Sequence, residues 1–331
     1  MRTQNSEGRA LKETELGEVS GPRSRACTGA GEGPGPPALP SSPSTLYRSE
    51  IWRLGLGLAK VLPGESCYRL ARGLSQVYWL LARRRRAAVI ENLLPALGGD
   101  FAAATRKSRE LLEQFALKIV DLWRYEAGLS IDHLLGPSTG WEEFQRVQSQ
   151  GRGVLLLTPH LGNWEFGGPA LRQRGVALQV ITLAEPGRGF TELRQASRAR
   201  WEINTLVIGN DPFAFVEIIR RLEAGATVAL LVDRPPPPTA VKVQLFGKPF
   251  AASVAAAELA RASGCALLPV YLPRRGAAYE AHILPEIPYD RASLRDLEAR
   301  RELTQGIMQV FEPIIRQHLD QWFHFVPVFL H

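Results

Sequence analysis

His160 and Glu165 are the two residues whose types and spacing best fit acid–base chemistry. His160 follows the apolar run Gly153–Thr158 and precedes a segment that we expect to be helical. In one continuous helix the two side chains would point about 140° apart, but a strand, a loop and a helix start would let the carboxylate face the imidazole. The carboxylate would then fix the ring tautomer, and the other ring nitrogen could accept a proton from a hydroxyl group. The pair predicts a general base; a capping histidine beside a solvated glutamate is the alternative.

Polar residues at the ends of two apolar runs are further candidates. Asn163 is placed to cap the helix that would carry Glu165, because asparagine often satisfies the free N–H groups at a helix start. Asp233 and Arg234 follow the run Thr227–Val232, and an arginine after an apolar strand is well placed to hold an anionic substrate. The alternative for Asp233 and Arg234 is a surface ion pair that caps the strand.

The elements that would position these residues alternate along the chain. Short apolar runs separated by helix-like segments favour an α/β fold with a mostly parallel central sheet flanked by helices. Ligands of such sheets gather at the carboxyl ends of the strands, where His160 would lie. The expected strands are 153–158, 178–183, 206–208, 227–232 and 266–271; the expected helices are 165–174, 190–202, 212–224, 251–263 and 291–319, after a helical region at 87–130.

The N-terminal third differs in composition from the rest. Residues 1–45 are rich in glycine, proline and serine, so we expect a disordered tail, followed by one domain at residues 46–331. The chain has a formal net charge of +7, and the segment 46–92, with nine basic and three acidic residues, supplies +6 of it. Its apolar stretch is broken at Pro63-Gly64 and ends at Arg83–Arg86, which favours a basic amphipathic segment on an anionic membrane surface. A core helix followed by a solvated arginine turn is the alternative.

Several other classes of protein are disfavoured. The three cysteines, Cys27, Cys67 and Cys265, are far apart, which supports neither a disulfide framework nor a zinc site. The sequence has no secretory signal pattern, no apolar stretch of transmembrane length, and no GxSxG, HExxH or P-loop motif. The basic segment lacks a nucleic-acid-binding signature, so we expect no nucleic-acid partner.

The segment Thr158–Glu165 resembles the His–x4–Glu motif of the bacterial lipid A biosynthesis acyltransferases, the late lauroyl and myristoyl acyltransferases of the lysophospholipid acyltransferase superfamily. Further segments resemble the same family in the same order, and together they span roughly residues 50–325. These segments are Asn92-Leu93, Leu230–Arg234, Leu245–Pro249, Gly264–Val270 and Gln321-Trp322.

The resemblance implies a glycerolipid acyltransferase-like fold and a membrane-associated O-acyltransferase that needs no metal or other cofactor. His160 would be the general base and Glu165 would orient it, while Asn163, Arg188, Asp233 and Arg234 would contact the substrate. The donor would be an acyl carrier protein or acyl-CoA thioester, and the acceptor a hydroxyl group of a lipid A precursor or related glycolipid. The implied location is the cytoplasmic face of a bacterial inner membrane, bound through residues 46–92 as a peripheral or monotopic protein.

Two positions depart from the family pattern. Glu185-Pro186 stands where the family often has Arg-Pro, and Arg188, Arg194 and Arg198 are candidates to replace that arginine. The segment after Trp322 lacks the trailing basic residues of the family. These departures leave two alternatives open: a different acceptor, such as a lysophospholipid or a mannosylated inositol lipid, and a non-catalytic lipid-binding homologue.

Overall fold

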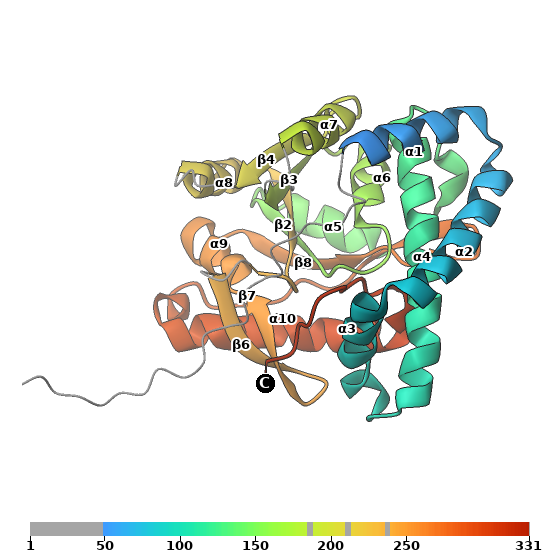
Figure 1. Ribbon diagram of the computed structural model, residues 1–331. Helices are drawn as coiled ribbons and strands as arrows, with labels where there is room; N and C mark the ends of the chain where they lie inside the picture. Colours follow the sequence, from blue (N-terminus) through green and yellow to red (C-terminus); the bar gives the residue numbers. More distant parts are fainter. Residues whose placement is uncertain (1–48, 184–187, 209–212, 236–238, 331) are drawn as a thin grey trace, which may run out of the picture. The chain divides into compact units, whose positions relative to one another are not determined.

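The computed structural model describes residues 49–183, 188–208, 213–235 and 239–330, all of which belong to one unit. The predicted disordered tail, the start of the predicted domain at residue 46, and Glu185 lie outside the described residues. The helices are α1 (Ser49–Val61), α2 (Gly64–Leu81), α3 (Arg83–Leu93), α4 (Phe101–Glu126), α5 (Trp141–Gln148), α6 (Gly167–Arg172), α7 (Arg188–Ala199), α8 (Phe213–Glu223), α9 (Ala255–Ser263) and α10 (Leu297–Gln317) (Figure 1). The strands are β1 (Leu135–Thr139), β2 (Val154–Thr158), β3 (Leu178–Leu183), β4 (Asn204–Ile208), β5 (Thr227–Leu231), β6 (Ala240–Leu245), β7 (Lys248–Ser253), β8 (Ala266–Tyr271), β9 (Arg274–Arg275) and β10 (Ala278–Ile283).

The predicted α/β fold with a mostly parallel central sheet is confirmed. The sheet has the strand order β1-β10-β8-β2-β5-β3-β4, and β9 pairs with β10 outside this path. The central strands β8, β2, β5, β3 and β4 run parallel to one another, whereas β10 is antiparallel to β8. Strand β2 lies between β8 and β5, so the residues that follow β2 emerge from the middle of the sheet.

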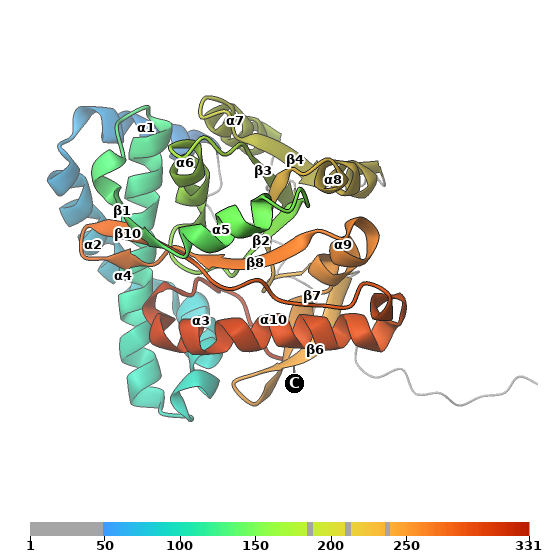
Figure 2. The same cartoon turned by 180° about the vertical axis from the view of Figure 1, so that it is seen from behind.

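Both faces of the sheet are covered, which explains why its strands are apolar throughout. Leu155 and Leu157 of β2 belong to the same buried cluster as residues of α8, α9 and α10. Val154 and Leu156 alternate with them and belong to a second cluster with residues of α5 and α6. In the view from behind, α5 lies above β8 and α10 lies below it (Figure 2). A strand with two buried faces reads as a continuous apolar run, as residues 153–158 do.

Strands that the sequence did not predict lie outside the central parallel part. They are β1, β10 and the short β9 at one side of the sheet, and the separate antiparallel hairpin of β6 and β7. The helix predicted at 251–263 begins only at Ala255, because residues 248–253 form β7 instead. These strands are partly exposed and mix polar with apolar residues, so they lack the uniform apolar pattern of a buried strand.

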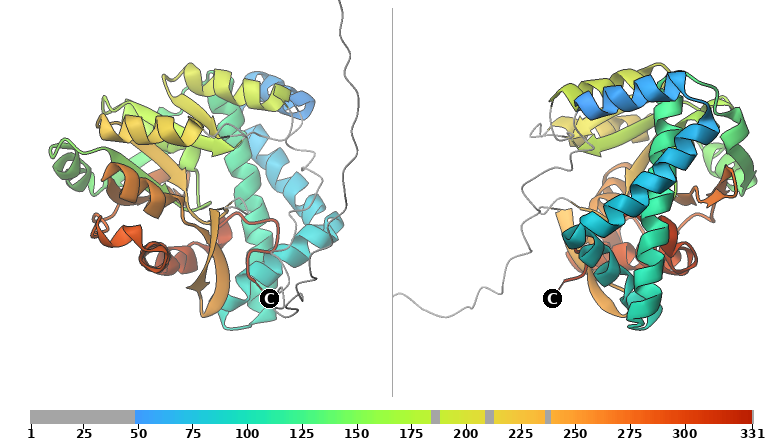
Figure 3. Two further views of the ribbon diagram at one scale, coloured as in Figure 1. Left: turned by 90° about the vertical axis from the view of Figure 1, so that its left-hand side faces the viewer. Right: turned by 45° about the vertical axis from the view of Figure 1, so that its right-hand side comes forward.

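The N-terminal helices pack around α4. Figure 3 shows α1 and α2 against α4, with the chain turning sharply between α1 and α2 at the predicted break, Pro63-Gly64. Trp52 of α1 is buried with Ile119 and Leu122 of α4. The four consecutive arginines begin α3 rather than forming a turn. None of the described helices is long and apolar enough to cross a membrane.

Candidate active site

His160 and Asp233 occupy matching positions after two neighbouring strands. β2 and β5 are parallel, with Thr158 opposite Leu231 at their carboxyl ends. Pro159 separates the end of β2 from His160, and Val232 separates the end of β5 from Asp233. The strand register therefore brings the imidazole and the carboxylate together at the edge of the sheet where α/β proteins bind ligands.

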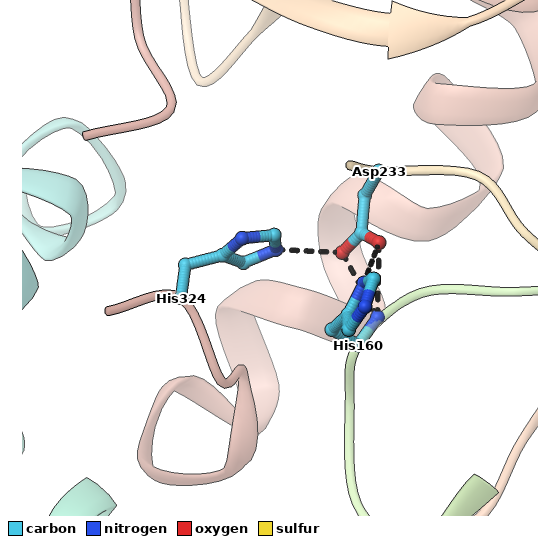
Figure 4. Close-up of side chains that lie close together, drawn as sticks. All are labelled: His160, Asp233 and His324. Atoms are coloured by element: carbon cyan, nitrogen blue, oxygen red, sulfur yellow. Dashed lines mark hydrogen bonds and ion pairs between the residues drawn. The ribbon is translucent and has the colours of Figure 1, made fainter. Parts of the chain in front are cut away.

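The Asp233 carboxylate is surrounded by hydrogen-bond donors (Figure 4). His160 Nδ1 lies 2.7 Å from Asp233 Oδ1, and the His160 backbone N–H donates to both carboxylate oxygens at 3.1 and 2.9 Å. Trp322 Nε1 donates to Asp233 Oδ2 at 2.9 Å, and His324 Nε2 lies 2.8 Å from the same oxygen. Because all of these groups can donate to it, the Asp233 carboxylate is held in its ionised form on the Nδ1 side of His160.

Burial and charge set the protonation of this pair. Burial lowers the pKa of His160 below its ordinary value, although the charge and hydrogen bond of Asp233 oppose this effect. Burial would raise the pKa of Asp233, but the charges and hydrogen bonds of His160 and His324 outweigh it and hold that pKa well below the usual range. Asp233 is then an acceptor only, so His160 Nδ1 carries a proton and Nε2 has a free lone pair. None of the described residues bonds to that Nε2 atom.

Glu165 does not contact His160, which corrects the predicted orientation of the imidazole by this glutamate. Its carboxylate accepts hydrogen bonds from Arg198 at 2.8 and 3.2 Å and forms an ion pair with Arg194 at 2.6 Å. Arg194 also pairs with Glu126 of α4, whose other oxygen accepts a 2.5 Å hydrogen bond from the indole of Trp52. Glu165 therefore links the loop after β2 to α7, and Asp233 takes the place beside His160.

The other predicted site residues lie in different surroundings. Asp233 is buried beneath His160, and its contact with the substrate stays a prediction. Arg234, the next residue, is exposed, and its substrate contact stays a prediction. Asn163 is buried at the predicted N-cap position, before a short 3-10 helix at Trp164–Phe166, but its side chain makes no capping hydrogen bond; its substrate contact stays a prediction. The side chain of Arg188 lies outside what the structure describes, so its predicted contact also stays a prediction.

Gly162 gives the loop after His160 a shape that other residues cannot adopt. It has a φ of +62°, and a Cβ atom at this position would overlap the carbonyl carbon and oxygen of Leu272. The next residue, Asn163, donates its backbone N–H to that same carbonyl at 2.9 Å. The glycine therefore allows the loop to lie directly against the segment that follows β8.

Comparison with known families agrees with this geometry. The sequence model of the bacterial lipid A biosynthesis acyltransferases matches residues 48–331. The chain belongs to this family. The resemblance to this family is thus confirmed, and the matched range includes Asp233 and the three residues that bond to it, His160, Trp322 and His324.

Named relatives in two bacterial groups are similar to this family member. The phosphatidylinositol mannoside acyltransferase of Mycobacterium tuberculosis (strain CDC 1551 / Oshkosh) is 28% identical over 204 residues, or 60% of this chain and 61% of the relative. The protein of the same name from Mycolicibacterium smegmatis is 28% identical over 249 residues, 72% of this chain and 76% of the relative. The lipid A biosynthesis lauroyltransferase of Escherichia coli K12 is 28% identical over 265 residues, 75% of this chain and 83% of the relative. The match to the first of these spans less than two thirds of its length.

His160, Asp233 and His324 also form the kind of cluster that can bind a metal. They offer three ligand atoms that all lie within 4.8 Å of one another. However, each of these atoms is already hydrogen-bonded within the cluster, and Asp233 accepts further N–H groups from Trp322 and the backbone of His160. The same distances fit a histidine–carboxylate hydrogen-bond network, which is the arrangement that acid–base chemistry needs.

Sequence reasoning missed the residues that complete the site from distant parts of the chain. His324 was passed over because it does not follow an apolar strand, and Trp322 was noted only as part of a signature. Lys118 of α4 is buried with its Nζ 2.8 Å from the centre of the Trp164 ring, which in turn lies 5.1 Å from the His160 ring. For the His160–Asp233 pair, the sequence did offer one signal: each of these residues follows the end of its strand after one intervening residue.

Proposed function

We propose that this protein is an O-acyltransferase that moves a fatty acyl chain from a thioester to a hydroxyl group of a lipid. The observation that carries the proposal is the His160–Asp233 pair at the ends of β2 and β5, with the Nε2 atom of His160 left for the substrate. The membership of the chain in the lipid A biosynthesis acyltransferase family supports the same chemistry.

The reaction follows from the protonation of this pair. His160 Nε2 takes the proton of the acceptor hydroxyl as its oxygen attacks the thioester carbonyl carbon. Asp233 stabilises the resulting imidazolium through Nδ1–H. The tetrahedral intermediate then expels the thiolate, which takes the proton from Nε2 and leaves as a thiol. An ester replaces the thioester, and no redox change occurs.

The acceptor we propose is a lipid A precursor or a related glycolipid. The Escherichia coli relative is named for lipid A and the mycobacterial relatives for a phosphatidylinositol mannoside. A mannosylated inositol lipid is therefore the second candidate acceptor, and both candidates present sugar hydroxyl groups on an anionic lipid. The donor would be an acyl carrier protein or acyl-CoA.

A surface on α1 and α2 supports contact with a membrane, which we propose is the cytoplasmic face of a bacterial inner membrane. Large apolar side chains are exposed along both helices, and the fractional exposure reaches 80% for Val61 and 76% for Leu81. Arg83–Arg86 follow immediately at the start of α3. Exposed apolar side chains beside a basic cluster suit the headgroup region of anionic lipids. We call this the foot surface: Leu54, Leu58, Val61, Leu70, Leu74, Val77, Tyr78, Leu80 and Leu81 with Arg83–Arg86.

The experiment that tests the activity is an assay of thiol release from acyl-CoA and from acyl carrier protein, with the full chain and a glycolipid acceptor. We expect His160→Ala to lower the rate by about 10²–10⁴-fold, the usual contribution of a general base. His133→Ala is the control, because His133 is an exposed histidine away from the site. Wild-type protein that binds the lipid but releases no thiol would support the non-catalytic alternative.

Mass spectrometry of the acceptor separates the two glycolipid classes. Lipid A precursors and mannosylated inositol lipids are offered separately with the same acyl donor. The true acceptor gains the mass of one acyl chain. We expect this gain with the wild-type protein and with His133→Ala, but not with His160→Ala. A mass gain on neither class, together with thiol release on a lysophospholipid, would reject the glycolipid acceptor.

A further inference from the structure

The chain near its C-terminus approaches the candidate active site from a separate direction. Gln321 accepts a hydrogen bond from the backbone N–H of Gly162 at 3.0 Å, and Phe323 donates its own to the carbonyl of His160 at 2.7 Å. Leu161 and Trp322 form an antiparallel bridge between these two bonds. The C-terminal segment, defined as Gln321–Val328, is therefore paired with the loop that carries His160.

The same segment directs the Asp233 carboxylate. Trp322 Nε1 and His324 Nε2 both bond to Oδ2, while His160 Nδ1 bonds to Oδ1. Because Asp233 is ionised and can only accept, His324 Nε2 is a donor in this arrangement. Figure 4 shows the two imidazole rings on different sides of the carboxylate. These two side-chain donors, together with the His160 backbone N–H, fix the rotation of the carboxylate and point Oδ1 at the His160 ring.

A single buried side chain from a distant helix holds this segment in place. The Asn92 amide of α3 donates to the carbonyl of His324 at 3.2 Å and to that of Val326 at 2.8 Å. Its oxygen accepts the backbone N–H of Val328 at 3.1 Å. Asn92 is buried, and its amide group makes three hydrogen bonds to one short stretch of backbone. Neither an aspartate nor an aliphatic side chain offers the same two donors and one acceptor.

We propose that Asn92 is a positioning residue of the active site, acting through the C-terminal segment that seats Trp322 and His324 on Asp233. This inference rests on the function proposed above. Asn92 bonds to neither His160 nor Asp233, so its effect on them must pass through residues 322–328. The side chain would thus couple α3, which begins with the arginines of the foot surface, to the geometry of the general base.

The direction of the effect on His160 follows from charge. Donors on Oδ2 draw negative charge away from Oδ1, and without them the carboxylate would stabilise the His160 imidazolium more strongly. Release of the segment also admits water, which again favours the charged ring. We expect Asn92→Leu and His324→Phe each to raise the pKa of His160 by about 0.5–1 and to lower kcat about 10–100-fold with little change in KM.

The test titrates His160 by NMR of its ring nitrogens in the full-length protein and measures kcat against pH. His324→Gln keeps an N–H donor near Oδ2, so we expect it to restore most of what His324→Phe loses. Gln305→Leu is the matched control, since Gln305 makes two similar bonds to the backbone of Gln244, at 2.6 and 3.0 Å, and neither bond involves Asp233 or the C-terminal segment. It should leave the titration of His160 unchanged.

A double variant decides whether Asn92 acts through the segment. If it does, Asn92→Leu combined with His324→Phe is little worse than His324→Phe alone, because both remove the same contact to Asp233. Additive effects, or a wild-type titration of His160 in Asn92→Leu, would overturn the proposal. If Asn92→Leu does not fold, Asn92→Asp, which keeps the acceptor for Val328, is measured instead. Since the titration needs no substrate, a missing acyltransferase activity would show itself separately, as a lack of thiol release by the wild type.

Discussion

At the scale of single residues, the site depends on how His160 is kept neutral yet basic. Burial disfavours the imidazolium, and the adjacent Asp233 carboxylate favours it, with burial the larger effect. A histidine whose pKa is lowered is present in its active, deprotonated form at neutral pH. In the proposed reaction the protonated ring would then be acidic enough to return the proton to the leaving thiolate.

The first prediction concerns pH. Because the pKa of His160 is lowered, Nε2 stays deprotonated as the pH falls toward the ordinary histidine value of about 6.5 and is protonated only below it. We therefore expect kcat/KM for thiol release to be level near pH 7 and to fall on the acid side of pH ~6.5. Initial rates between about pH 5 and pH 8 measure this limb. A fall in rate centred above pH 7 would contradict the assignment of the partly buried His160 as the general base.

The second prediction separates Glu165 from the proton transfer. Glu165→Gln removes the negative charge that pairs with both Arg194 and Arg198, and these guanidinium groups are nearly buried. We expect the free energy of unfolding to fall by about 2–3 kcal/mol, below the range for a fully buried pair because Arg194 keeps Glu126. Urea unfolding measures the loss, with the exposed Glu223→Gln as the control. The pKa of His160 read from the pH dependence of kcat/KM should be the same in Glu165→Gln as in the wild type. A shift as large as that expected for His324→Phe would instead support Glu165 as the carboxylate that orients His160.

At the scale of elements, the strand register was the most predictable part of the site. The apolar runs located all five central parallel strands to within a few residues, since strands buried on both faces have few polar residues. The partner of His160 was misassigned because its neighbour in sequence, Glu165, was preferred to its neighbour across the sheet, Asp233. Strands β1, β9 and β10 and the β6–β7 hairpin mix polar and apolar side chains and gave no comparable signal.

The third prediction belongs to the loop between β2 and α6. Gly162→Ala places a Cβ atom on the Leu272 carbonyl, and Gly276→Ala is a matched control with a similar φ of +59° but open space around the new atom. A Cβ atom at a left-handed position costs about 1–2 kcal/mol, which is all we expect for Gly276→Ala. Gly162→Ala should cost clearly more and should also lower the rate of thiol release, because His160 moves with the loop. Thermal unfolding and initial rates of both variants measure this; equal losses would contradict it.

At the scale of the whole molecule, residues far apart in sequence meet at Asp233. Asn92 lies 232 residues before His324, and Asp233 lies 91 residues before it. Sequence patterns reveal local periodicity, but such distant pairs depend on how the helices and the sheet pack, so the roles of Asn92, Trp322 and His324 could not be predicted. The basic segment was visible in the charge distribution, whereas the side of α1 and α2 that is exposed became clear only from packing on α4.

The fourth prediction concerns the foot surface as a unit. Replacing Val61 and Leu81 with aspartate puts charges on two of its most exposed apolar positions. We expect binding to vesicles that contain anionic phospholipid to weaken at least 10-fold, since both the apolar contact and the charge attraction are reduced. Sedimentation with vesicles measures binding, and Leu297→Asp, at a comparably exposed leucine on α10, is the control. Equal binding by the control and the double variant would reject the foot surface as the contact.

The hydrogen bonds of Trp322 and His324 to Asp233 have a consequence for the order of assembly. A ribosome makes the strand that carries His160 long before the segment that holds its carboxylate partner, and domains form as the chain emerges. A nascent chain can therefore build much of its sheet while Asp233 still lacks its donors. Asp233 would therefore gain these two donors only after the sheet and the N-terminal helices have been made, so a chain cut before Trp322 would lack the complete site.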